Sequence, residues 1–426
     1  MAFRYSLMNK TSIFWVLMNK RWLFFLAFLL TGCSTSTQSI SLDPPTEAIE
    51  TPFVQPISTI TPTPTSNCLV QTEYSRDISN PSGNLIIRKK QNLYLLSLSD
   101  LSLKLITSEE TGFILISPSR KNFLVEQEID YPALSKYKKI VLYDANGIVI
   151  KEYEKEDDWK GVPPKVSPRL NWINEENFAV AMSPLGSFTI ININTDERRE
   201  FIFRDGIKLY NPTSLSLFNY EGVVSLSPKL DQVFYSSERD KQIYLAVFNS
   251  LEENNNADYP YIIRWTRGYH DTLFSASWSP DGNYLAVKLS NTYGTERSIY
   301  DLYLINQHGM NVVQLTDFAN FYPEAQFIHI KIGGWFPDGD HIGLLVRTAN
   351  SKEELEQQKK GFVPMKLVIV NTKSRTMTDY CDIPVDIPYY SPDGKFIAIR
   401  DSIIDLEKKI SYKITNGDIY GWLKTP

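Results

Sequence analysis

The sequence predicts an all-β repeat protein. A bulky residue, a Ser-Pro-Asp-Gly turn or a close variant, and a second apolar run occur together at Trp278–Val287, Trp335–Ile342 and Tyr390–Ala398. Proline presets φ, aspartate tolerates the bridge region and glycine accepts a positive φ, so each copy predicts a tight turn between two strands. Weaker copies place the bulky residue at positions 116, 172, 226, 278, 335 and 390, at intervals of 52 to 57 residues. A hairpin that returns at such a period indicates a repeat architecture.

Each repeat contains two further apolar runs. The third run commonly ends in Asn or Asp, as in Ile140–Asp144 and Tyr300–Asn306, and a short polar turn leads to a fourth run such as Glu197–Phe203 or Ser374–Tyr380. Four short strands per unit at this period are typical of the blades of a β-propeller.

The two ends of the chain predict how the repeat closes. Residues 84–107 hold three apolar runs without a leading first strand, and Asp418–Leu423 resembles a first strand with no hairpin after it. Gly421–Trp422 also matches Gly334–Trp335. We expect the two fragments to complete one blade, which gives seven four-stranded antiparallel blades in a ring closed by the C-terminal strand. The alternative is six blades with an irregular extra piece.

The N-terminus has the features of a targeting segment. Lys20–Arg21 precede the apolar run Trp22–Leu30, which is too short for a permanent transmembrane helix, and Leu30–Cys33 follows. This pattern resembles a bacterial lipoprotein signal, and Met18 would provide an ordinary start for it. The resemblance implies that residues 1–32 are removed and that Cys33 becomes the lipidated N-terminus. The alternative is an uncleaved anchor with an incidental cysteine.

The remaining chain divides into a linker and one large domain. Residues 33–67 are rich in Ser, Thr and Pro, ending in Thr61–Thr65, and predict an extended stalk. Residues 68–426 form the predicted propeller domain. Lipidation would hold this domain at the outer side of the cytoplasmic membrane, or at an outer membrane where one exists.

Two cysteines lie in the predicted domain, Cys68 at its start and Cys381 after the fourth run of a late repeat. An exported chain permits a disulfide between them. Sixteen residues separate Cys68 from Asn84, and an extended chain of that length spans about 50 Å. The alternative is two unpaired cysteines in the core.

The repeats and the lipoprotein-like N-terminus together resemble the TolB-like, WD-type propeller repeats of bacterial envelope proteins. The resemblance covers roughly residues 84–423 and is carried best by the last three turns, at Ser279–Gly282, Pro337–Gly339 and Ser391–Gly394. It implies a propeller used for binding. It implies no particular ligand, because propellers serve many functions.

Signals for catalysis are sparse. The net charge of −5 argues against nucleic acid as a partner. The chain has four histidines and contains no recognisable nucleophile, metal-binding or nucleotide-binding motif. Asp281, Asp338 and Asp393 occupy equivalent turn positions, which explains them without a ligand. The sequence therefore predicts no catalytic residue, metal or cofactor, and favours a binding protein over an enzyme.

The long segments fall mostly on one face of the predicted propeller, between second and third strands and between blades. Insertions concentrated on one face of a repeat protein commonly mark its binding face. The candidate ligand-binding residues there are Trp159, Tyr210, Arg267, Tyr269, His270, Tyr293, Arg297, Phe321 and Tyr322. We expect a monomer that binds a protein or a polysaccharide through this face. The alternative is a glycan lyase or hydrolase with its site at the channel mouth of the same face.

One of these segments predicts a helix of its own. Ser351–Glu354 has the sequence of a capping box, and the charged residues after it predict a solvated helix through Lys360.

Overall fold

The computed structural model divides the chain into residues 1–52 and 53–426, and all of its described residues belong to the second unit. The described residues are 65–66, 68–73, 81–109, 111–130, 136–153, 169–181, 187–202, 224–230, 232–237, 242–247, 261–263, 276–290, 297–306, 312–360, 363–384 and 386–425. Within these ranges, no helix has the length and apolar composition needed to cross a bilayer.

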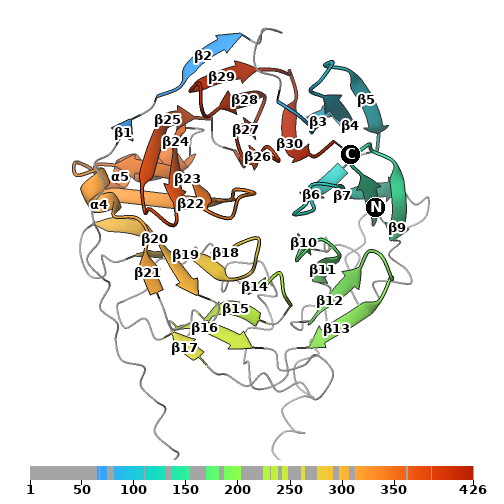
Figure 1. The fold of residues 1–426 in the computed structure, drawn as a ribbon, viewed down its shortest axis with the longest axis horizontal. Helices are drawn as coiled ribbons and strands as arrows, with labels where there is room; N and C mark the ends of the chain where they lie inside the picture. The colour runs from blue at the N-terminus through green and yellow to red at the C-terminus, as the bar shows by residue number, and fades with distance from the viewer. Residues whose placement is uncertain are drawn as a thin grey trace, which may run out of the picture. The chain divides into compact units, whose positions relative to one another are not determined.

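The strands follow one another in antiparallel sets of four (Figure 1). We name each set after its innermost strand. The β30 sheet contains β30 (Asp418–Leu423), β3 (Asn84–Lys89), β4 (Asn92–Ser97) and β5 (Leu103–Thr107). The β6 sheet contains β6 (Thr111–Ile116), β7 (Asn122–Asp130), β8 (Lys136–Asp144) and β9 (Val149–Tyr153). The β10 sheet contains β10 (Arg169–Trp172), β11 (Asn177–Ala181), β12 (Ser187–Asn192) and β13 (Arg198–Ile202).

Later sets repeat this order. The β14 sheet contains β14 (Val224–Leu226), β15 (Gln232–Ser237), β16 (Gln242–Val247) and β17 (Tyr261–Ile263). The β18 sheet contains β18 (Ala276–Trp278), β19 (Tyr284–Ser290), β20 (Ser298–Asn306) and β21 (Val312–Gln314). The β22 sheet contains β22 (Phe327–Trp335), β23 (His341–Ala349), β24 (Met365–Asn371) and β25 (Met377–Ile383), and the β26 sheet contains β26 (Tyr389–Tyr390), β27 (Phe396–Ile399), β28 (Ser402–Asp405) and β29 (Ile410–Lys413). A short parallel pairing of β20 with β22 joins two of these sets.

The innermost strands of neighbouring sets lie beside one another. Contacts join β30 to β6, β6 to β10, β14 to β18, β18 to β22, and β26 to β30. The bulky residue found in the repeat makes several of these contacts: the Nε1 of Trp172 donates to the Leu115 carbonyl at 3.1 Å, and that of Trp335 to the Ser277 carbonyl at 3.0 Å. In Figure 1 the innermost strands face the middle of this unit and the fourth strands lie outside. Consecutive four-stranded sheets with this packing are the architecture of a β-propeller.

The turn between the first two strands has the predicted chemistry. In the β18 sheet the Ser279 hydroxyl donates to the Asp281 carboxylate at 2.5 Å, and the backbone amide of Asn283 donates to the same carboxylate oxygen at 3.0 Å. Gly282 has a φ of +68°. The turn of the β26 sheet repeats this pattern with Ser391 and Asp393. These carboxylates are therefore used by their own turns.

The C-terminal strand pairs as predicted. β30 lies antiparallel to β3, with Leu423 opposite Asn84 and Asp418 opposite Arg88. Trp422 is 1% exposed, and its Nε1 donates to the Ser82 carbonyl at 2.9 Å. The last strand of the chain therefore completes the sheet that begins more than 300 residues earlier.

Two helices occur in the described residues. Ser351 caps α5 (Lys352–Lys360) as predicted, because the Glu354 backbone amide donates to the Ser351 hydroxyl at 3.1 Å. The Glu354 carboxylate accepts from the Asn350 amide at 2.8 Å, one residue before the position expected in a capping box. The segment between the β18 and β22 sheets contains the short helix α4 (Phe318–Phe321), where the sequence predicted only a loop. Asp317 caps it by accepting a hydrogen bond from the Asn320 amide.

Two short strands precede the propeller and run along its outside. β1 (Thr65–Ser66) pairs in parallel with β25, and β2 (Val70–Glu73) pairs in parallel with β29 (Figure 1). The structure contains the predicted disulfide between Cys68 and Cys381, whose Cα atoms are 4.8 Å apart. Thr65–Ser66, at the end of the predicted linker, thus pairs with the β22 sheet, whereas Val70–Glu73 belongs to the predicted domain and pairs with the β26 sheet.

Candidate functional site

Each set of strands has two ends, and they differ in chemistry. We call the end with the short turn between the first and second strands the turn end, and the end where the second strand leads to the third the link end. Arg88, Gly112, Glu126, Tyr389 and Tyr420 come together near the link end of three neighbouring sheets. We call these five residues the Arg88 cluster.

A β-bulge places the first aromatic residue of the cluster. Gly421 pairs with Ile86 and Ile419 pairs with Ile87, so Tyr420 is an extra residue in β30. Bulges re-aim a side chain and often lie near functional sites. Here the guanidinium of Arg88 lies over the Tyr420 ring, 4.3 Å from its centroid. This is the geometry of a cation–π contact.

A second bulge brings in the neighbouring sheet. Thr111 pairs with Gln127 and Ile114 with Val125, so Gly112 and Phe113 together oppose Glu126. The Arg88 Nη2 donates to the Gly112 carbonyl at 2.8 Å. A Cβ on Gly112 would collide with the Glu126 carboxylate, so a larger residue here would have to displace that side chain. Phe113, directly after it, is 53% exposed.

Tyr389 completes the cluster from the β26 sheet. Burial, and after it the charges of Asp386 and Tyr420, raises the pKa of Tyr389 above its usual value, while Arg88 opposes that shift. The hydroxyl therefore keeps its proton at neutral pH and can donate a hydrogen bond. Ile387, two residues before it, is 47% exposed.

The cluster combines features that are common at binding sites. Arginine and tyrosine are enriched at the energetic centres of interfaces, where a rigid aromatic face and a forked cation act together. The buried Nε of Arg88 has no hydrogen-bond partner among the described residues. Two exposed apolar side chains, Phe113 and Ile387, lie close in the sequence to cluster residues. No group of three or more His, Cys, Asp or Glu residues within the described ranges could hold a metal ion.

Most of the candidates chosen from the sequence cannot be placed. Cys33 and six of the ligand-binding candidates lie outside the described residues: Trp159, Tyr210, Arg267, Tyr269, His270 and Tyr293. Arg297 is exposed just before β20. The sequence-based site at the long-loop face is thus represented by three residues.

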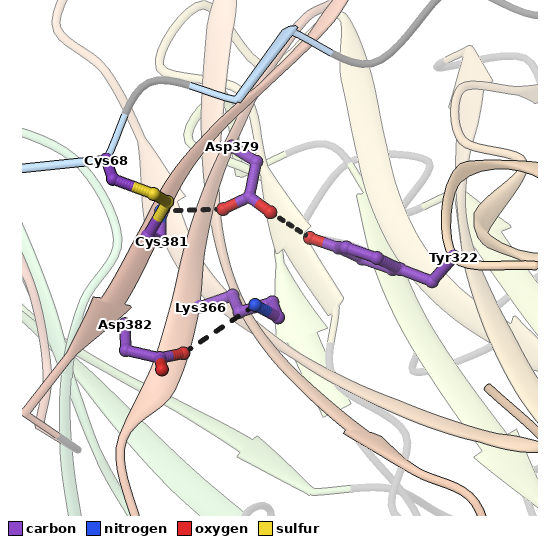
Figure 2. Close-up of a disulfide and its surroundings, with 6 residues drawn as sticks. All are labelled: Cys68, Tyr322, Lys366, Asp379, Cys381 and Asp382. Carbon is purple, nitrogen blue, oxygen red and sulfur yellow. Dashed lines mark hydrogen bonds and ion pairs between the residues drawn. A yellow bond between two sulfur atoms is a disulfide. The ribbon is translucent and has the colours of Figure 1, made fainter. Parts of the chain in front are cut away.

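The two aromatic candidates in and beside α4, Phe321 and Tyr322, make contacts within the fold. Phe321 is 4% exposed and packs in the core, so its side chain is not part of a binding surface. The Tyr322 hydroxyl donates to Asp379 at 2.7 Å, beside the disulfide (Figure 2). Burial, and after it the charge of Asp379, raises the pKa of Tyr322. The structure does not bring either residue to the Arg88 cluster.

None of the residues of the Arg88 cluster was predicted as a binding residue from the sequence. Their positions depend on two bulges, which residue type alone does not reveal. The available signal was glycine within first strands, because Gly112 and Gly421 both adjoin bulged residues.

No protein-family model and no curated protein matches this sequence. Among solved structures, the chain is similar to the periplasmic gluconolactonase PpgL of Pseudomonas aeruginosa, with 14% identity, coverage of 80% of this chain and 98% of that chain, and a TM-score of 0.45. TolB from Acinetobacter baumannii matches with 13% identity, coverage of 72% and 65%, and a TM-score of 0.37. An oligogalacturonate lyase from Vibrio parahaemolyticus matches with 10% identity, coverage of 77% and 82%, and a TM-score of 0.44. Similarity at this level says nothing about activity.

Proposed function

We propose that this protein is a binding propeller, anchored outside the cytoplasmic membrane through lipid on Cys33, which recognises a protein or polysaccharide at the link end of its sheets. The observation that carries the proposal is the Arg88 cluster, in which the guanidinium of the half-buried Arg88 lies over the Tyr420 ring near the link end. The long segments predicted to form the binding face leave the sheets at the same end. The predicted binding face and the Arg88 cluster therefore lie at the same end of the sheets.

Closure of the propeller underlies this site. We infer a ring of seven blades. Side chains also join the two pairs of neighbouring sheets that the strand contacts given above do not include, β10 with β14 and β22 with β26. The Asn174 side chain donates to the Pro228 carbonyl at 2.8 Å between the β10 and β14 sheets, and Tyr390 lies against Gly343 between the β26 and β22 sheets. Together with the strand contacts, these pairs support a closed circuit of sheets that returns to β30.

An enzyme with its site at the same place is the second candidate, because titratable groups converge in the Arg88 cluster. Two observations weigh against it. Glu126 is fully buried, so its carboxylate cannot reach a substrate in this structure. The raised pKa of Tyr389 keeps its hydroxyl protonated, which makes it a poor general base at neutral pH. The cluster is better suited to binding.

The test compares link-end and turn-end variants of the full-length protein in a pull-down from native membranes. Arg88→Gln and Tyr420→Leu remove the guanidinium and the ring on which it lies. Lys395→Gln and Tyr284→Leu are the matched controls, because both residues are exposed near the turn end. We expect the link-end variants to retain at least about tenfold less bound protein or polysaccharide, a loss of about 1.4 kcal/mol or more.

The melting temperature of each variant shows whether a loss of binding follows from unfolding. Equal capture by the link-end variants and the wild type would contradict the proposal, as would an equal loss in the turn-end controls. Anchoring has a separate readout: Cys33→Ala should abolish lipid labelling and leave the precursor unprocessed. A Cys33→Ala protein that is still labelled and processed would overturn the lipoprotein assignment alone.

A further inference from the structure

The segment from Thr65 to Glu73 crosses the outer edges of two sheets, and we call it the strap. In β1, Thr65 pairs with Thr378 and Ser66 with Asp379 of β25. In β2, Val70 pairs with Ile410 of β29, and the Val70 amide donates to the Lys409 carbonyl at 3.0 Å. The disulfide to Cys381 lies between these two pairings (Figure 2).

The strand pairings of the strap are short. β1 has two residues and β2 has four. The structure describes the side chains of Cys68, Leu69 and Val70 in the strap: Cys68 and Val70 are exposed, and Leu69 packs, partly buried, against a core cluster. Ordering a chain segment costs conformational entropy at every residue. The disulfide adds a covalent link to these two short pairings.

Buried polar contacts surround Cys381, the half of the disulfide that lies in β25. Val368 pairs with Asp379 and Lys366 with Asp382, so β25 carries an extra residue between them, and Cys381 has a φ of +64°. Asp379, which is 7% exposed, accepts a hydrogen bond from the Cys381 amide at 2.6 Å and another from the Tyr322 hydroxyl at 2.7 Å. The bulge and these hydrogen bonds fix the backbone position from which Cys381 reaches Cys68.

We propose that the disulfide is a redox-operated latch for the strap. A dithiol reductant attacks the exposed Cys68 sulfur through its thiolate, and Cys381 leaves as a thiolate that takes up a proton. The second thiol of the reductant then attacks the mixed disulfide and releases Cys68 as a thiol. The reductant becomes a disulfide, and the protein gains two electrons and two protons. Reduction frees the strap, and oxidation fastens it again.

Release of the strap changes where the tether meets the propeller. In the oxidised state the chain is fixed at Cys68, and in the reduced state the first fixed element is β3, sixteen residues later, at Asn84. A segment of that length adds up to about 50 Å of reach. Release also exposes the outer backbone edges of β25 and β29. The gain in reach rests on the anchoring proposed above, whereas the release of the strap does not.

Hydrogen exchange of the detergent-solubilised full-length protein tests the latch. The oxidised protein is compared with the same protein after dithiothreitol treatment, so folding occurs with the disulfide in place. We expect amides of residues 65–73 to exchange at least about tenfold faster after reduction, while those of β24 and β28 keep their rates. Cys68→Ser should show the fast strap exchange from the start, with no further response to dithiothreitol.

Two outcomes would overturn the proposal. Strap amides that keep their exchange rates within about twofold after reduction would show that the strand pairings hold the strap without the bond. Faster exchange in β24 and β28 as well would show that the disulfide stabilises the whole domain and does not act as a latch. Neither outcome depends on lipidation, which is measured separately with Cys33→Ala.

Discussion

Tyr390 shows how one residue of the repeat fits its neighbour. It fills the bulky position of the β26 sheet, is 5% exposed, and lies against Gly343 of the β22 sheet. A Cβ on Gly343 would collide with the Tyr390 hydroxyl. Between the β26 and β22 sheets, the bulky residue of one sheet therefore fits against a glycine of the other.

This pair predicts a rescue. Gly343→Ala should cost about 1–3 kcal/mol of unfolding free energy, because it overpacks a buried contact. Tyr390→Phe removes the colliding oxygen, so the double variant should be more stable than Gly343→Ala alone. Gly339→Ala is the control, since no atom lies within 4 Å of its Cβ position and its cost comes from a φ of +71°. Denaturant titrations compare these four variants with the wild type, and purely additive effects of Gly343→Ala and Tyr390→Phe would refute the contact.

The turn aspartates predict a pH dependence. Burial raises the pKa of Asp281, but hydrogen bonds from Ser279 and Asn283 outweigh it and leave the pKa below its usual value. Asp338 is shifted down in the same way, with help from His341. A lowered pKa stabilises the fold above the unfolded value of about 4, and this contribution is lost as the pH falls through the folded value. Between pH 5 and pH 3 at about room temperature, the unfolding free energy of the Asp281→Asn variant should therefore fall less than that of the wild type.

At the scale of elements, the sequence predicted the turns and the helix cap, which depend on neighbouring residues. The turns at Asp281 and Asp393 and the cap at Ser351 follow from residue types at fixed spacing. The pairing of β30 with β3 follows from the incomplete repeats at the two ends of the chain. The bulges at Tyr420 and Gly112 follow from neither, because a bulge depends on the partner strand and on what packs behind it. The Arg88 cluster was missed for that reason. β1 was missed because the Ser/Thr/Pro-rich composition of residues 33–67 carries no strand signal, and β2 was missed because four residues are too few to show a periodic pattern.

The outer strands predict an edge effect. β5 and β9 are the last strands of their sheets among the described residues, and Leu105 and Ile150 are each 51% exposed. Exposed apolar edges favour association between chains. Leu105→Lys and Ile150→Lys should lower aggregation in light scattering and change the unfolding free energy by no more than about 0.5 kcal/mol. Leu95→Lys, at a position 6% exposed, is the control and should unfold the protein. Unchanged aggregation in the edge variants would argue against this role.

At the scale of the whole molecule, site and fold depend on the same pairing. β30 carries Tyr420 and β3 carries Arg88, so the strand that completes the first sheet also assembles the proposed site. The strap crosses the outside of the β22 and β26 sheets and leads into β3. A propeller that failed to close at β30 would lose the Arg88 cluster together with its last strand.

The most direct measurement is the melting temperature of two C-terminal truncations. Deleting residues 418–426 removes β30 and its fully buried Trp422, whose loss alone typically costs about 3–5 kcal/mol. Deleting residues 424–426 removes only the chain after the strand. We expect the longer deletion to melt far lower or to aggregate, and to lose ligand capture, while the shorter one behaves as wild type. A protein lacking residues 418–426 that kept the wild-type melting temperature would contradict closure by β30, and with it the seven-bladed ring.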